Sequence, residues 1–226
     1  MFKFLAQEYV SQYGFLNLFN FITFRVGASI LTSLFFSLIF GQFIINKLSK
    51  IQPNGQPIRN DGPQTHIIKK AGTPTMGGVL IILSVFSSSV LWSDLYNSFV
   101  WIGLLALISF GFIGLIDDYN KIKSNSSNGL KAITRIILQI VFSLLISLVI
   151  LKILDDQIDT TISFPFFKNL IINFGYFYLL ISLFILVGSA NSVNLTDGLD
   201  GLAIVPVMIV AMTFAFIAYV SGNVVF

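Results

Sequence analysis

The strongest constraint on the fold is a series of six segments that are almost free of charge and about as long as a bilayer is thick. Long continuous apolar runs lack the two-residue alternation of barrel strands, and lipid admits only helices or closed barrels as spanning structures. The sequence therefore predicts an all-α fold, a polytopic membrane helical bundle with six spans. These spans cover about residues 26–45, 76–93, 99–116, 136–151, 169–188 and 201–220.

The composition agrees with a membrane protein and excludes several other classes. Of the 226 residues, 55% are hydrophobic and 10% are charged, whereas soluble domains carry about 25% charged residues. The formal net charge of +3 is too small and too scattered for a nucleic-acid surface, so no nucleic-acid partner is expected. The sequence has no cysteine and one histidine, which excludes Cys-ligated or His-cluster metal sites built from these residues.

The start of the chain differs from the six apolar segments. Residues 4–22 mix aromatic side chains with polar ones, among them Gln7 and Glu8. This mixture favours a helix that lies at the membrane interface over one that spans it. We therefore divide the chain into an N-terminal interfacial segment, residues 1–25, and a membrane domain, residues 26–226.

The positions of the cations predict the orientation in the membrane. The loop after the first span carries five Lys and Arg residues and the loop after the third carries four, together nine of the thirteen in the chain. The positive-inside rule then places loops 46–75, 117–135 and 189–200 in the cytoplasm and the N-terminus in the periplasm. Loop 189–200 breaks the charge pattern, because it carries Asp197 and Asp200 but no cation.

The first polar cluster on the cytoplasmic side is GTPTMGG, residues 72–78, which follows Lys69 and Lys70. Thr73 and Pro74 resemble an N-cap followed by Pro at the first helical position, so the second span is predicted to start here. A free helix N-terminus beside two lysines attracts anions. The alternative is a Gly-rich helix start that lets a neighbouring helix approach closely. Spacing alone does not separate the two.

The second cluster is GLIDDYNKIK, residues 114–123, where two acids end an apolar span. Adjacent carboxylates at Asp117 and Asp118 lie about 100° apart on a helix and are suited to bind Mg²⁺ or to orient a nucleophile. Lys121 is spaced to face either acid, and with Lys131 it would offset phosphate charge. The alternative is an ordinary helix-end ion pair. Two neighbouring acids anchor the inside end of a span poorly, which favours the functional interpretation.

The third cluster is SANSVNLTDGLDG, residues 189–201, which places amides and acids at three-residue intervals. Each step of three turns the side-chain direction by about −60° on a helix, so the last acid drifts to the opposite face. A bent or broken segment is therefore predicted, and an Asp-Gly pair supplies the turn. The alternative is a polar corner between two spans, which would need fewer polar groups. The four residues are Asn191, Asn194, Asp197 and Asp200.

Taken together and in this order, GTPTMGG, GLIDDYNKIK and NSVNLTDGLDGLA resemble the motifs of the phospho-N-acetylmuramoyl-pentapeptide-transferases. These integral membrane enzymes of peptidoglycan synthesis belong to the polyprenyl-phosphate sugar-1-phosphate transferases, glycosyltransferase family 4. The segment NGQPIRNDGPQTH at 54–66 is also similar to the family's first cytoplasmic loop, and the similarity runs from about residue 20 onward. Related enzymes that act on UDP-N-acetylglucosamine share a diacid and an Asn/Asp-rich loop, but their other motifs usually read differently.

This resemblance implies a reaction and a set of partners. Undecaprenyl phosphate would attack the β-phosphate of UDP-N-acetylmuramoyl-pentapeptide to give lipid I and UMP, with Mg²⁺ as cofactor. The enzyme would be a multi-pass protein of the bacterial inner membrane, surrounded by lipid, with its site loops in the cytoplasm; a homodimer is one possible assembly.

The resemblance also implies roles for individual residues. Asp117 and Asp118 correspond to the catalytic, Mg²⁺-binding diacid, and the motif does not say which acid contacts the metal and which orients the lipid phosphate. The residues that correspond to the substrate site are Lys70, Thr75, Lys121, Asn191, Asn194, Asp197 and Asp200, and the charge argument above adds Lys131.

The sequence departs from the family in one respect. The family has about ten membrane helices, with a further essential Asp and a His-rich loop after the region matched here, against six apolar segments in this chain. We therefore expect the chain to represent the N-terminal two-thirds of such an enzyme, as a fragment or a truncated product, and to be inactive on its own.

Two other classes of protein compete with a transferase. An ion-coupled transporter would carry its acids near the bilayer midplane on interrupted helices, whereas the acids here end the apolar segments on one face. A non-catalytic scaffold would not need the diacid.

Overall fold

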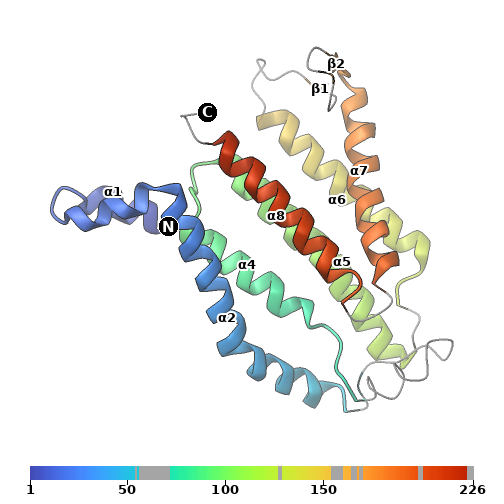
Figure 1. The fold of residues 1–226 in the computed structure, drawn as a ribbon. Helices are drawn as coiled ribbons and strands as arrows, with labels where there is room; N and C mark the ends of the chain where they lie inside the picture. Colours follow the sequence, from blue (N-terminus) through green and yellow to red (C-terminus); the bar gives the residue numbers. More distant parts are fainter. Residues whose placement is uncertain are drawn as a thin grey trace.

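The computed structural model of the chain is mostly helical (Figure 1). It describes residues 1–53, 55, 72–126, 129–153, 160–163, 167, 170–197 and 201–222. The helices are α1 (Phe2–Tyr9), the 3-10 helix η1 (Gly14–Asn20), α2 (Ile22–Ile51), α4 (Gly78–Trp92), α5 (Ser98–Ser124), α6 (Ala132–Ile153), α7 (Phe177–Thr196) and α8 (Ile204–Ser221). Two short strands, β1 (Thr161–Ser163) and β2 (Ile171–Asn173), lie between α6 and α7.

Each apolar segment of the sequence overlaps a helix, but within the described residues only five helices are long and apolar enough to cross a membrane. The exception is α4, whose 15 residues correspond to about 22 Å of helix, less than the roughly 30 Å of a bilayer core. The predicted start of this helix at Thr73 was wrong. Met76 has a left-handed backbone with φ of 72°, which a right-handed helix cannot contain, so α4 begins only at Gly78.

The fold is not purely α-helical as predicted, because β1 and β2 form a small antiparallel hairpin in which Thr161 pairs with Asn173. The Asn173 side chain accepts a hydrogen bond of 2.9 Å from the backbone N–H of Gly175, whose φ is 49°. This turn delays the start of α7 to Phe177. Within the predicted fifth span, residues 171–173 are therefore strand and residues 175–176 are turn.

The helices from α2 to α7 pack against one another in chain order. Contacts join α2 to α4, α4 to α5, α5 to α6 and α6 to α7. On its inner side α6 buries Gln139, Ser143 and Ser147, and the Ser147 hydroxyl lies 2.7 Å from that of Ser182 in α7. Small residues such as these serines let membrane helices approach closely. Large apolar side chains such as Leu38 on α2 are exposed, as a lipid-facing surface requires.

The N-terminal segment, which contains α1 and η1, extends to one side of the bundle and contacts α2 and α4 (Figure 1). Phe2 and Phe19 pack their rings on Trp92 at the end of α4, with centroids 4.9 and 5.7 Å apart. Lys3 forms an ion pair with Asp94 in the α4–α5 connection. The hydrogen bond from Lys3 holds the pKa of the Asp94 carboxyl below its usual range. That this segment lies at the membrane interface stays a prediction.

Candidate active site

The diacid lies near the C-terminal end of α5. Lys121, one turn further along, places its ammonium nitrogen 2.6 Å from Asp117 Oδ2 and 3.0 Å from Asp118 Oδ1. The prediction that Lys121 can face either acid is confirmed, since one ammonium group bridges both carboxylates. The side chains of the two acids are 14% and 26% exposed, so a ligand from solvent can still reach their remaining oxygen surface.

Asp118 is held from a second direction by the segment that precedes α4. The Thr75 hydroxyl donates a 2.8 Å hydrogen bond to Asp118 Oδ2. Thr75 is itself fixed by Gln52, the residue that caps the C-terminus of α2. Gln52 Oε1 accepts the backbone N–H of Thr75 at 2.9 Å, and Gln52 Nε2 donates to the Thr75 carbonyl at 3.4 Å. The C-terminal end of α2, the segment before α4 and the C-terminal part of α5 therefore meet at the Asp118 carboxylate.

Asp117 is held by the loop between α5 and α6. The backbone N–H of Leu130 donates a 2.8 Å hydrogen bond to Asp117 Oδ1. Gly129 lies so close that a Cβ at this position would be 2.6 Å from the Asp117 Cγ and 2.7 Å from Oδ2. A glycine is needed here because the Asp117 carboxylate occupies the space that a Cβ would take.

These contacts lie at one end of the bundle. In Figure 1 the C-terminal ends of α2 and α5 lie at the lower end of the bundle, and the N-terminal ends of α4 and α6 face the same end, opposite the β1–β2 hairpin. The diacid is therefore placed among loops rather than in the middle of the helices.

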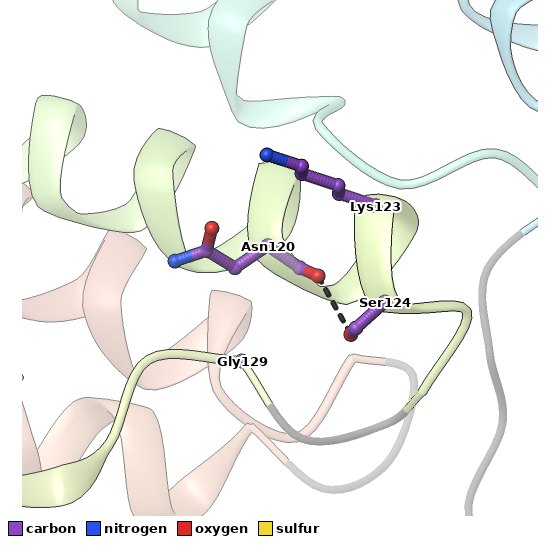
Figure 2. Close-up of a pocket in the computed structure, with 4 residues that line it drawn as sticks. All are labelled: Asn120, Lys123, Ser124 and Gly129. Atoms are coloured by element: carbon purple, nitrogen blue, oxygen red, sulfur yellow. Dashed lines mark hydrogen bonds between the residues drawn. The ribbon is translucent and has the colours of Figure 1, made fainter.

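An open hollow of about 410 Å³ lies beside the diacid, lined by Asn120, Lys123, Ser124 and Gly129. Figure 2 shows Asn120 and Ser124 on successive turns of α5, joined by a 2.7 Å hydrogen bond from the Ser124 hydroxyl to the Asn120 carbonyl, with Gly129 on the facing loop. Its volume is within the range of small-molecule sites, about 300–1,000 Å³. Because Gly129 also contacts Asp117, the hollow and the carboxylates share a wall.

The remaining predicted residues lie elsewhere or outside the described part of the chain. Lys131 is exposed just before α6. Asn194 is exposed in the last turn of α7, and Asp197 is exposed at its C-cap. Lys70 and Asp200 fall outside the described residues.

Asn191 lies inside α7, although residues 189–200 were predicted to form a loop. The predicted break of this segment is found near its end, because the helix stops before Asp197. The helix α7 runs through Asn191 and Asn194 and ends at Thr196. The Asn191 amide nitrogen donates to Gln139 Oε1 of α6 at 2.7 Å and to the Val187 carbonyl at 2.8 Å. These hydrogen bonds satisfy the Asn191 side-chain amide within α7, so this polar residue does not end the helix.

The donor set at the diacid fits a magnesium ion. Among the described residues no group of three or more His, Cys, Asp or Glu side chains could hold a metal. Mg²⁺ typically uses one or two carboxylates and completes its shell with water and substrate phosphates, and Asp117 with Asp118 supplies that number. Mg²⁺ binding by these residues stays a prediction.

Comparison with known proteins agrees with this arrangement. The profile of glycosyl transferase family 4 matches residues 100–226, which include both acids, and phospho-N-acetylmuramoyl-pentapeptide-transferase signature 1 matches residues 70–82, which include Thr75. The chain is 50% identical over 222 residues to the phospho-N-acetylmuramoyl-pentapeptide-transferase of Pelagibacter ubique, covering 98% of this chain and 61% of that protein. The enzyme of the same name from Rickettsia akari is 49% identical over 210 residues, covering 93% and 58%.

The chain thus spans about three fifths of the length of these curated relatives. Within that span, both the family profile and the signature fall on the segments that carry the diacid and its hydrogen-bond partner. The chain therefore belongs to glycosyl transferase family 4 and carries the signature of the phospho-N-acetylmuramoyl-pentapeptide-transferases.

Proposed function

We propose that this chain carries the diacid of an enzyme that transfers phospho-N-acetylmuramoyl-pentapeptide from UDP to undecaprenyl phosphate, forming lipid I and UMP. The observation that carries the proposal is the hydrogen bond between Thr75 and Asp118. It joins the signature segment, residues 70–82, to the carboxylate pair of the family profile. One contact thereby links the segment whose signature indicates the substrate to the two carboxylates proposed to take part in the reaction.

Phosphoryl transfer depends on alignment and charge neutralisation more than on covalent protein chemistry. A phosphate oxygen of the lipid forms a bond to the β-phosphorus, while the bond from that phosphorus to the bridging oxygen breaks and UMP leaves with that oxygen. Thr75 and the Leu130 amide orient the two carboxylates, and Lys121 offsets negative charge beside them. Mg²⁺ bound at Asp117 and Asp118 would neutralise phosphate charge.

The position of the acids suits two substrates of opposite solubility. Undecaprenyl phosphate is dissolved in lipid and the nucleotide is soluble, so their phosphates can meet only at the membrane face. Asp117 and Asp118 lie one to two turns before the end of α5, with loops on either side. An ion-coupled transporter is disfavoured by this location, since its acids would be expected near the bilayer midplane.

The reaction is tested by UMP release from UDP-N-acetylmuramoyl-pentapeptide. The full reading frame, meaning this chain with any coding sequence that flanks it, is purified in detergent and supplied with undecaprenyl phosphate and Mg²⁺. We expect UMP release that depends on both additions, and much less with UDP-N-acetylglucosamine as donor. Release from UDP-N-acetylglucosamine alone would instead assign the enzyme to the related N-acetylhexosamine-1-phosphate transferases.

We also propose an inner-membrane topology with six spans, α4 included, a periplasmic N-terminus and cytoplasmic loops 46–75, 117–135 and 189–200. The sequence lacks cysteine, so single cysteines at Asn54, Ser126 and Asp156 can be labelled on intact cells with a membrane-impermeant thiol reagent. We expect labelling at 156 only, because the positive-inside rule places 54 and 126 in the cytoplasm. Labelling at 54 or 126 without labelling at 156 would overturn the orientation.

A further inference from the structure

We infer that Gln52 is a positioning residue for the diacid, acting on Asp118 through Thr75. This inference rests on the proposed function for its catalytic consequence, but the contact itself can be tested without activity. Gln52 does not touch Asp118; the chain of contacts runs from its amide to the Thr75 backbone and from the Thr75 hydroxyl to the carboxylate.

Both ends of the Gln52 amide are used by the same residue. The carbonyl oxygen accepts the N–H of Thr75 and the amide nitrogen donates to its C=O, as a neighbouring strand would. Gln52 is 3% exposed, so water is a poor substitute for either bond. A buried polar group that loses its partner bears the full desolvation cost. The pairing therefore fixes where Thr75 lies relative to the end of α2.

The segment around Thr75 needs such an anchor. Gly72 and Met76 on either side of Thr75 both have left-handed backbones, with φ of 79° and 72°. A non-glycine residue in this region is sparsely populated and persists where surrounding contacts hold it. The bonds from Gln52 hold Thr75, which lies between these two residues and donates a hydrogen bond from its hydroxyl to Asp118.

The orientation of the Asp118 carboxylate depends on two partners from different elements. Lys121 binds Oδ1 from the same helix, and Thr75 binds Oδ2 from the segment before α4. Without Gln52, Thr75 can move away from Asp118. Lys121 then remains as a partner of one carboxylate oxygen, and a single partner does not define the plane of the carboxylate. Misplacing a reactive group lowers the rate of the chemical step more than it weakens substrate binding. Gln52 is buried, so a direct effect on KM is not expected.

The first test replaces Gln52 by Met, which keeps the length of the side chain and removes both hydrogen bonds. In the full reading frame we expect kcat for UMP release to fall about tenfold with KM changed less than about twofold. The matched control is Gln42→Met on the same helix, where the amide donates to Asn46 at an exposed position, and it should retain kcat. An unchanged kcat in Gln52→Met, or a rise in KM alone, would contradict the inference.

The second test asks whether Gln52 acts through Thr75. Thr75→Val removes the hydroxyl and keeps the branched shape, so Gln52→Met should add little to its kcat loss if both belong to one chain of contacts. Fully additive losses would show that Gln52 acts by another route, such as general stability of α2.

A third measurement keeps the inference separate from the proposed reaction. Hydrogen exchange of the Thr75 amide in the purified full reading frame should quicken in Gln52→Met and stay unchanged in Gln42→Met. Equal protection in both variants would refute the Gln52 contact. Absence of UMP release by the unsubstituted enzyme, with faster exchange in Gln52→Met, would refute the proposed function and leave the contact intact.

Discussion

Asp118→Asn and Asp117→Asn are each expected to lower UMP release by the full reading frame by about 10²-fold or more. Asparagine keeps the size of the side chain and can still accept a hydrogen bond from Thr75 or from the Leu130 amide. It removes the negative charge that a magnesium-assisted phosphoryl transfer requires. Steady-state turnover at saturating substrate is the measurement, with Mg²⁺ varied to show whether the defect lies in metal use.

Both variants should still insert and purify, because the acids lie near a helix end and are partly exposed. Asp94→Asn is a suitable control, since this acid pairs with Lys3 before the opposite end of α5. This substitution removes a carboxylate that precedes the N-terminal end of α5, whereas the diacid lies near its C-terminal end. Turnover should therefore persist. Near-normal activity in both Asp117→Asn and Asp118→Asn would refute the role proposed for the diacid.

Local patterns predicted the helices and the ion pair because both depend on neighbours in sequence. Long apolar runs leave the chain little choice but helix in lipid, and the three- and four-residue spacing of Lys121 from the acids is a property of any α-helix. The start of α4 was missed because the Thr-Pro pair is only a local signal. The left-handed Met76, which excludes an earlier start, belongs to a loop held by a distant residue.

The partners that orient the carboxylates could not be predicted for the same reason. Gln52 is one amide directly after a long apolar helix, and Gly129 reads as an ordinary turn residue. Their importance comes from contacts across 23 and 12 positions of sequence, to Thr75 and Asp117 respectively. Asn191 shows the converse: its polarity indicated a loop, yet Gln139 on α6 satisfies the amide and the helix continues.

Gly129→Ala is expected to impair turnover as severely as loss of the acid itself, by about 10²-fold, because an added Cβ displaces Asp117 and displacements of about 1 Å can have such effects. The new atom would lie 2.6 Å from the Asp117 Cγ and 2.7 Å from Oδ2, distances that no real contact allows. The backbone at Gly129 is not left-handed, so the effect comes from space and not from strain. Either the carboxylate turns away or the loop retreats and the Leu130 N–H loses its bond to Asp117.

Gly103→Ala is the matched control, because it adds the same methyl group to α5 at a position with open space around the Cβ. Alanine also favours the helix over glycine by about 1 kcal/mol, so this variant should be at least as stable as the parent. The decisive comparison is Gly129→Ala combined with Asp117→Asn. If the methyl group acts only by displacing the Asp117 carboxylate, the double variant should be little worse than Asp117→Asn alone, since groups that act as a unit are strongly non-additive. A product of the two separate losses would mean that Gly129 also affects the hollow lined by Asn120 and Lys123, and unchanged turnover in Gly129→Ala would show that the loop is not held against the diacid.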